Sequence, residues 1–136
     1  MRRERGPKGR GVRGVYYPGY KAKDGTLPDR LHIVYVGANT LWSNPFIPGK
    51  AIGGNKRGET YAHCARLDPD AKVEDAQHAY DLYVAWLELC RPYTWAQLRS
   101  LAHASAFACW CPFKDPCHAD HLADVLAKAE SAGLLR

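Results

Sequence analysis

A short stretch near the end of the sequence gathers three of the five cysteines together with a histidine and two aspartates: Cys109-Trp110-Cys111-Pro112-Phe113-Lys114-Asp115-Pro116-Cys117-His118-Ala119-Asp120. Thiols, imidazoles and carboxylates act in proteins as nucleophiles, bases and metal ligands. An apolar run precedes the stretch, and a helical pattern follows it. Because α/β proteins bind ligands in the loops that leave their strands, we expect the chemistry of this chain here.

Cys117 is the predicted nucleophile. Asp115 and Pro116 place it in the first turn of the following helix, where unpaired N–H groups and the helix dipole favour a thiolate. His118 and Asp120 complete the predicted catalytic set. On a helix, His118 projects about 100° away from Cys117, so we expect it to bind substrate or pair with a carboxylate. Asp120 is equally explained as an acid that stabilises the helix dipole, and the helix start also attracts phosphate or ribose.

A metal site is the alternative explanation of the same residues. Cys109, Cys111, Cys117 and His118 offer sulfur and nitrogen ligands of the kind that zinc takes. Their spacing is irregular, because the usual C-x2-C pair is missing and Cys117 and His118 are adjacent. No cofactor is therefore favoured, and zinc stays the alternative. Cys109 by itself is explained as a small buried hydrophobic residue of a central strand.

A second candidate segment follows the clearest predicted strand, residues 31–36, which is apolar almost throughout. Trp42 in the following loop can stack on a base, and Asn44 can hydrogen-bond the edge of a base. Equally, Trp42 can fix the loop to the core. Loops at the carboxyl ends of parallel strands meet at one edge of a sheet, so we expect this loop and the 111–118 turn to line one crevice. The predicted ligand-binding residues are Gly37, Asn39, Trp42, Asn44 and Cys111.

The rest of the pattern predicts the elements that position these segments. Residues 14–17 and 104–110 are predicted strands, and residues 38–68 form a long irregular segment. Asp68 or Asp70 is expected to cap an amphipathic helix that ends at residues 91–92.

Two further helices are predicted near the end of the sequence. Thr94 opens a short helix with a capping-box pattern. The last helix has Cys117 in its first turn, shows helical apolar spacing from Asp120 to Ala132, and ends at Gly133. This order of elements predicts an α/β fold: a small three-layer Rossmann-like sandwich with a short, mostly parallel sheet.

Composition and charge indicate one domain with a basic arm. The chain has 136 residues, of which 46% are hydrophobic, so residues 15–136 can form a single α/β domain. Residues 1–14 hold six basic residues against one acidic residue, which accounts for the whole net charge of +5. This flexible arm can contact a phosphate backbone or serve as a solubilising tail. No membrane-spanning stretch or export signal is visible and the cysteine count is odd, so we expect a cytoplasmic location with reduced thiols.

Several motifs together resemble a known family: Val34-Tyr35-Val36-Gly37, Trp42-Ser43-Asn44-Pro45-Phe46, Tyr80-Asp81-Leu82-Tyr83, Trp86-Leu87, Cys109-Trp110-Cys111-Pro112 and Cys117-His118-Ala119-Asp120. Their order and spacing resemble the small phage and bacterial proteins catalogued as domain of unknown function 4326. The resemblance implies an α/β fold with a polar site, and membership among phage proteins implies work on nucleic acid, nucleotides or host defence.

These observations predict a phage-type protein that binds a nucleotide, nucleoside or modified base at the strand-end crevice and catalyses a transfer or hydrolysis there. A nucleotide or nucleic-acid component is the expected partner, and no membrane is. Two alternatives stay open. One is a metal-stapled nucleic-acid-binding module, and the other is a phage inhibitor that contacts a host protein through its surface.

Overall fold

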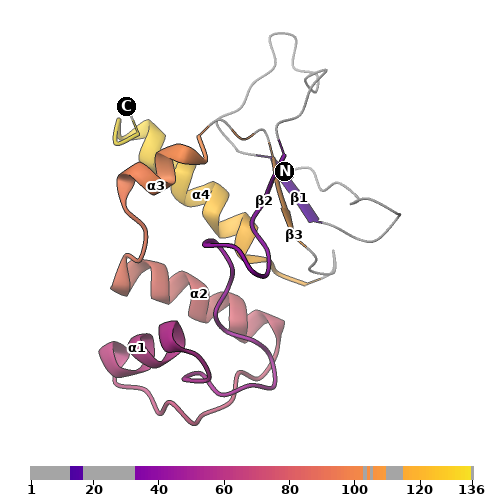
Figure 1. The fold of residues 1–136 in the computed structure, drawn as a ribbon, viewed down its shortest axis with the longest axis vertical. Helices are drawn as coiled ribbons and strands as arrows, with labels where there is room; N and C mark the ends of the chain where they lie inside the picture. Colours follow the sequence, from indigo (N-terminus) through magenta and orange to yellow (C-terminus); the bar gives the residue numbers. More distant parts are fainter. Residues whose placement is uncertain (1–12, 17–32, 103, 105, 110–114, 136) are drawn as a thin grey trace.

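The computed structural model describes residues 13–16, 33–102, 104, 106–109 and 115–135 (Figure 1). These residues form three strands and four helices. The strands are β1 (Arg13–Tyr16), β2 (Ile33–Tyr35) and β3 (Ala106–Cys109), and the helices are α1 (Lys56–Ala65), α2 (Ala76–Cys90), α3 (Trp95–Ser100) and α4 (His118–Ser131).

The strands form one mixed sheet in the order β1-β3-β2. β3 lies in the centre, where Phe107 is opposite Val15 of antiparallel β1 and Val34 of parallel β2. Phe107 is fully buried, as expected for an apolar residue with a strand on each side. The three predicted strands are therefore present, and each end lies one or two residues from its predicted position.

The predicted three-layer Rossmann-like sandwich with a mostly parallel sheet is wrong. The helices are 10, 15, 6 and 14 residues long, whereas the strands have only 4, 3 and 4 residues. One of the two strand pairings is antiparallel. In the described part of the chain, α4 contacts the strands, α2 packs on α4, and α1 packs on α2, so these helices follow one another away from the sheet (Figure 1). α4 is the helix that packs on β1 and β3, and most of the described core lies among helices and loops.

α2 begins later than the aspartates at 68 and 70 suggest. Its N-cap is Asp75, whose carboxylate accepts a hydrogen bond from the backbone N–H of His78 (2.8 Å). Val73 lies before the helix, where its backbone exchanges hydrogen bonds with Gly49 and Lys50. Val73 fits the apolar pattern of the helix because its side chain is buried. Its backbone, however, pairs with the 49–50 segment and is not helical.

α1 lies inside the segment that was predicted to be irregular. Asn55 caps it by accepting from the N–H of Gly58 (2.9 Å). Gly58 is required there, because a Cβ would overlap the carbonyl oxygen of Ile52. Only Gly58, Tyr61 and Ala62 are buried, so the helix has too short an apolar stripe for periodicity to reveal it.

The last two helices confirm their predicted capping signals. Thr94 Oγ1 accepts from the N–H of Gln97 (3.1 Å), and Gln97 Oε1 accepts from the N–H of Thr94 (2.8 Å), which is a complete capping box. α4 ends just before Gly133, which has a φ of 76°. It begins at His118, so Cys117 is its N-cap and is not within the first turn.

The remaining expectations concern the arm and the membrane. Residues 1–12 of the predicted arm lie outside the described residues, while Arg13 and Gly14 belong to β1. No helix in the part of the chain that the structure describes is long and apolar enough to span a membrane.

Candidate functional site

Tyr83 is the residue around which α2, the 37–46 loop and the start of α4 meet. It is fully buried, and its ring centroid lies 5.2 Å from that of His118. Its hydroxyl donates a hydrogen bond to the backbone carbonyl of Trp42 (3.2 Å). Burial raises the pKa of Tyr83 well above its ordinary value of 10, so the hydroxyl stays a donor. One side chain thereby joins both predicted segments.

His118 links the start of α4 to the end of β2. Its Nε2 atom lies 2.6 Å from the backbone carbonyl oxygen of Val36. A carbonyl can only accept, so Nε2 carries the proton, and Nδ1 of the neutral ring is an acceptor. The Sγ atom of Cys117 lies 3.9 Å from that Nδ1. Thiol, imidazole and carbonyl therefore form a continuous row.

This contact differs from the sequence expectation that His118 projects away from Cys117. The expected angle assumes that both residues are helical. Cys117 has an extended backbone (φ −131°, ψ 138°) because it is the N-cap, so its side chain can turn toward the next residue. Both side chains are buried, with 1% of Cys117 and 6% of His118 exposed.

Asp120 lies in the first turn of α4, where a carboxylate complements the helix dipole. Its backbone N–H donates to the carbonyl of Cys117 (3.0 Å). The residue is partly exposed, so of the three predicted catalytic residues it is the one that solvent reaches most readily.

Tyr80 and His121 also lie at this candidate site, although neither was among the predicted catalytic or ligand-binding residues. Their rings meet edge to face with centroids 6.4 Å apart. Burial raises the pKa of Tyr80, and the charges of Asp120 and Asp124 raise it further. Burial lowers the pKa of His121. Helical spacing was the available signal, because Tyr80 precedes Tyr83 by three residues and His121 follows His118 by three.

The predicted ligand-binding side chains of the 37–46 loop make contacts within the chain. Trp42 is 8% exposed, and its ring centroid lies 4.6 Å from that of Tyr93. Asn44 donates to the carbonyl of Ala79 (3.1 Å) and accepts from the N–H of Phe46 (2.9 Å). The Asn44 contact fixes the loop to α2, and the Trp42 contact fixes it to the segment between α2 and α3, which corresponds to the packing explanation of Trp42.

The turn at the start of this loop has a different character. Thr40 Oγ1 donates to the carbonyl of Gly37 (2.7 Å). Gly37 is buried, and a Cβ there would overlap the ring of Tyr35. Asn39 is exposed and has a left-handed backbone with φ of 67°. The exposed polar group of this turn therefore comes from Asn39.

The metal alternative concerns residues that the structure describes only in part. Cys111 lies outside the described residues, as does the rest of the 110–114 segment. Among the described residues, no group of three or more histidine, cysteine, aspartate or glutamate side chains is arranged to hold a metal ion.

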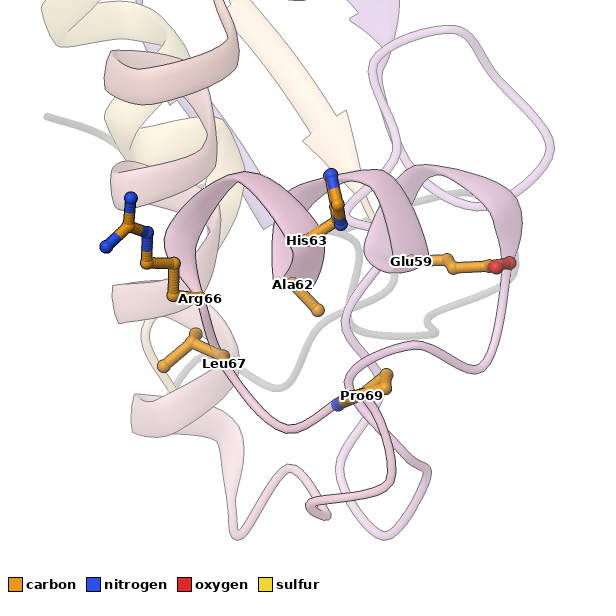
Figure 2. Close-up of a pocket in the computed structure, with 6 residues that line it drawn as sticks. All are labelled: Glu59, Ala62, His63, Arg66, Leu67 and Pro69. Carbon is orange, nitrogen blue, oxygen red and sulfur yellow. The ribbon is translucent and has the colours of Figure 1, made fainter.

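A surface hollow of about 630 Å³ lies on α1, away from Tyr83. It is lined by Glu59, Ala62, His63, Arg66, Leu67 and Pro69 (Figure 2). Figure 2 shows the charged ends of Glu59 and Arg66 at opposite sides of the hollow. Because these groups do not converge on one point, the hollow has weaker features of a site than the residues around Tyr83.

Comparison with known proteins gives one match. Residues 21–128 match the family described as Domain of unknown function (DUF4326). No curated protein and no solved structure gives a significant match.

Proposed function

The chain belongs to this family of unknown function, and we propose that it binds a nucleotide, nucleoside or modified base where α4 begins beside the end of β2, and catalyses a transfer or hydrolysis there. The proposed compartment is the cytoplasm, that of an infected or lysogenic host for a phage-encoded chain, because the reaction needs a reduced thiol.

The row formed by Cys117, His118 and Val36 carries this proposal. Thiol-dependent enzymes pair a nucleophile with a base and use a third group to orient that base. Here the Val36 carbonyl fixes the imidazole tautomer (2.6 Å), and Nδ1 faces the Cys117 sulfur (3.9 Å). In the proposed reaction, His118 takes the thiol proton as sulfur bonds to the transferred group, and returns it to the departing group. Water or a second acceptor then releases the transferred group from sulfur.

The charges around the site indicate which part of the ligand lies there. Asp81, Asp120 and Asp124 are all close enough to raise the pKa of Tyr80. A phosphate would be repelled by these carboxylates, whereas ribose hydroxyls and base amino groups can donate to them. We therefore place the sugar and base here, with Asp120 and Tyr80 as their contacts.

The proposal is tested by incubating the protein with a panel of nucleosides and nucleoside monophosphates and separating the products by chromatography. Cys117→Ser keeps the size of the side chain, and His118→Gln keeps a donor toward Val36 but lacks the base. We expect product formation by the wild-type protein and a loss of about 100-fold or more in each variant. Asp70→Asn is the matched control, because Asp70 lies in an exposed turn before α2.

Folding of each variant is checked by thermal melting, since Cys117 and His118 are buried. Equal activity in Cys117→Ser and the wild-type protein contradicts the thiol mechanism. If no member of the panel yields product or raises the melting temperature, the ligand class itself is wrong.

A further inference from the structure

Arg57 lies in the first turn of α1 and reaches back to the 41–43 segment. Its Nη2 atom donates to the hydroxyl oxygen of Ser43 (2.9 Å), and its Nη1 atom donates to the carbonyl of Leu41 (3.3 Å). Its guanidinium carbon lies 5.4 Å from the centre of the Trp86 ring, which gives a cation–π contact. These contacts hold the guanidinium in one orientation.

The positive charge of Arg57 has no ionic partner in the described part of the chain: its contacts there are with carbonyl oxygens, hydroxyls and an aromatic ring. Arg57 is half-buried, and a cation held partly out of water is usually paired with an anion. The adjacent Lys56 adds a second positive charge in the same turn. Helix dipoles disfavour cations at this end of a helix and favour anions. With Lys56 and Arg57 against Glu59, the first turn of α1 keeps a net positive charge.

Hydrogen-bond donors remain available beside this charge. A guanidinium has more N–H groups than the bonds to Leu41 and Ser43 use. The Ser43 hydroxyl accepts from Arg57, so its own proton is free to donate to another group. Ser43 is only half-buried, and Leu41 is exposed. A guanidinium fork beside a hydroxyl matches the several acceptor oxygens of a phosphate group.

We propose that Arg57 and Ser43 bind a phosphate group at the junction of α1 and the 41–43 segment. Cys117 and His118, which carry the proposed function, are not among the contacts of Arg57 and Ser43, so each proposal can fail without the other. The arrangement is preformed, because Tyr93 also donates to the Leu41 carbonyl (2.9 Å) and holds that segment from its other side.

The test measures thermal melting during titration with inorganic phosphate and, separately, with a simple phosphate monoester. Ionic strength is held constant with sodium chloride. We expect the wild-type melting temperature to rise by about 8 °C at a concentration about 100-fold above the dissociation constant. Binding of inorganic phosphate but not of the monoester identifies the free ion as the ligand, whereas binding of both shows that the site also accepts a phosphate carried on a larger molecule.

Three variants separate binding from structural effects. Arg57→Gln should abolish the shift, and Ser43→Ala, which removes a half-buried hydroxyl, should weaken the apparent affinity about tenfold. Arg99→Gln, at an exposed position of α3, should keep the full shift, as should Cys117→Ser.

The proposal is overturned if phosphate does not raise the wild-type melting temperature. It is also overturned if Arg57→Gln, folded as judged by its circular dichroism, shows the same rise as the wild-type protein. An equal rise with acetate would show that the site recognises any anion and not phosphate.

Discussion

Replacement of Tyr83 by phenylalanine tests the central contact of the structure. The ring stays in place against Trp86 and His118, with centroid distances of 5.7 Å and 5.2 Å. The hydroxyl is lost, together with its hydrogen bond to the Trp42 carbonyl (3.2 Å) and its contact with the Tyr93 hydroxyl. A net hydrogen bond contributes about 1 kcal/mol, and a buried acceptor left without its donor costs about 1–3 kcal/mol. We therefore expect Tyr83→Phe to lower the free energy of unfolding by about 2 kcal/mol.

Tyr93→Phe is the matched comparison. The hydroxyl of Tyr93 also donates to a backbone carbonyl of this loop, that of Leu41 (2.9 Å), but this bond is exposed. Water can replace the lost donor there, so we expect a cost of about 0.5 kcal/mol. Because the two tyrosine hydroxyls contact each other, both variants lose that contact, and the difference between their costs reports the buried Trp42 carbonyl. Both values are obtained from urea denaturation at pH 7. The cost of Tyr83→Phe corresponds to a melting temperature about 6 °C lower. If Tyr83→Phe costs no more than Tyr93→Phe, the inferred role of burial is refuted.

Three further predictions concern other parts of the fold. Burial lowers the pKa of His121 below its usual 6.5, so the unfolded chain takes up a proton first, and the free energy of unfolding should fall as pH drops from about 6.5 through the folded-state pKa. His121→Gln should flatten this dependence in urea titrations, whereas exposed His63→Gln should not. Burial and the adjacent thiol of Cys64 raise the pKa of Cys90. We expect hydrogen peroxide to oxidise these two thiols to a disulfide, with release of water, and peptide mapping detects the cross-link. Absence of the cross-link would contradict the adjacency of the two thiols. Thr94→Ala should cost about 1 kcal/mol in the same urea assay, and an unchanged value would mean that the cap contributes nothing.

Elements with local signals could be predicted from the sequence. The capping box at Thr94 and the glycine after α4 each depend on residues a few positions apart, so their pattern contains the whole interaction. The apolar stripe of α1 is short, and the position of this helix depends on Gly58 fitting closely against Ile52. That contact is specific to the folded chain and leaves no periodicity.

The sheet could be predicted only in part for a similar reason. Strand positions follow from local apolar runs, but the order and direction of pairing depend on residues far apart in the sequence. The antiparallel pairing of β1 with β3 therefore could not be deduced from the alternation of elements, and the Rossmann-like prediction failed at this point.

For the candidate site, the cysteine and histidine motif predicted Cys117 and His118 as site residues, and the structure brings their side chains into contact, which the expected orientation did not allow. Helical geometry was applied to Cys117, whereas its extended N-cap backbone turns the thiol toward His118. For Asn44, the sequence did not distinguish between two roles of the side chain. An amide in a loop has the same appearance in a sequence whether it binds a ligand or, as here, holds Ala79 and Phe46.

The strand order has a consequence for how the chain acquires its structure during synthesis. β1 and β2 are made early, yet each pairs with β3, as the partners Arg13 with Cys109 and Ile33 with Ala106 show. The ribosome must therefore synthesise the chain through β3 before β1 or β2 can pair with its neighbouring strand. α1, α2 and α3 can form before β1 and β2 are paired. A product that is truncated or stalled before β3 would therefore expose unpaired strand edges, which are prone to aggregation.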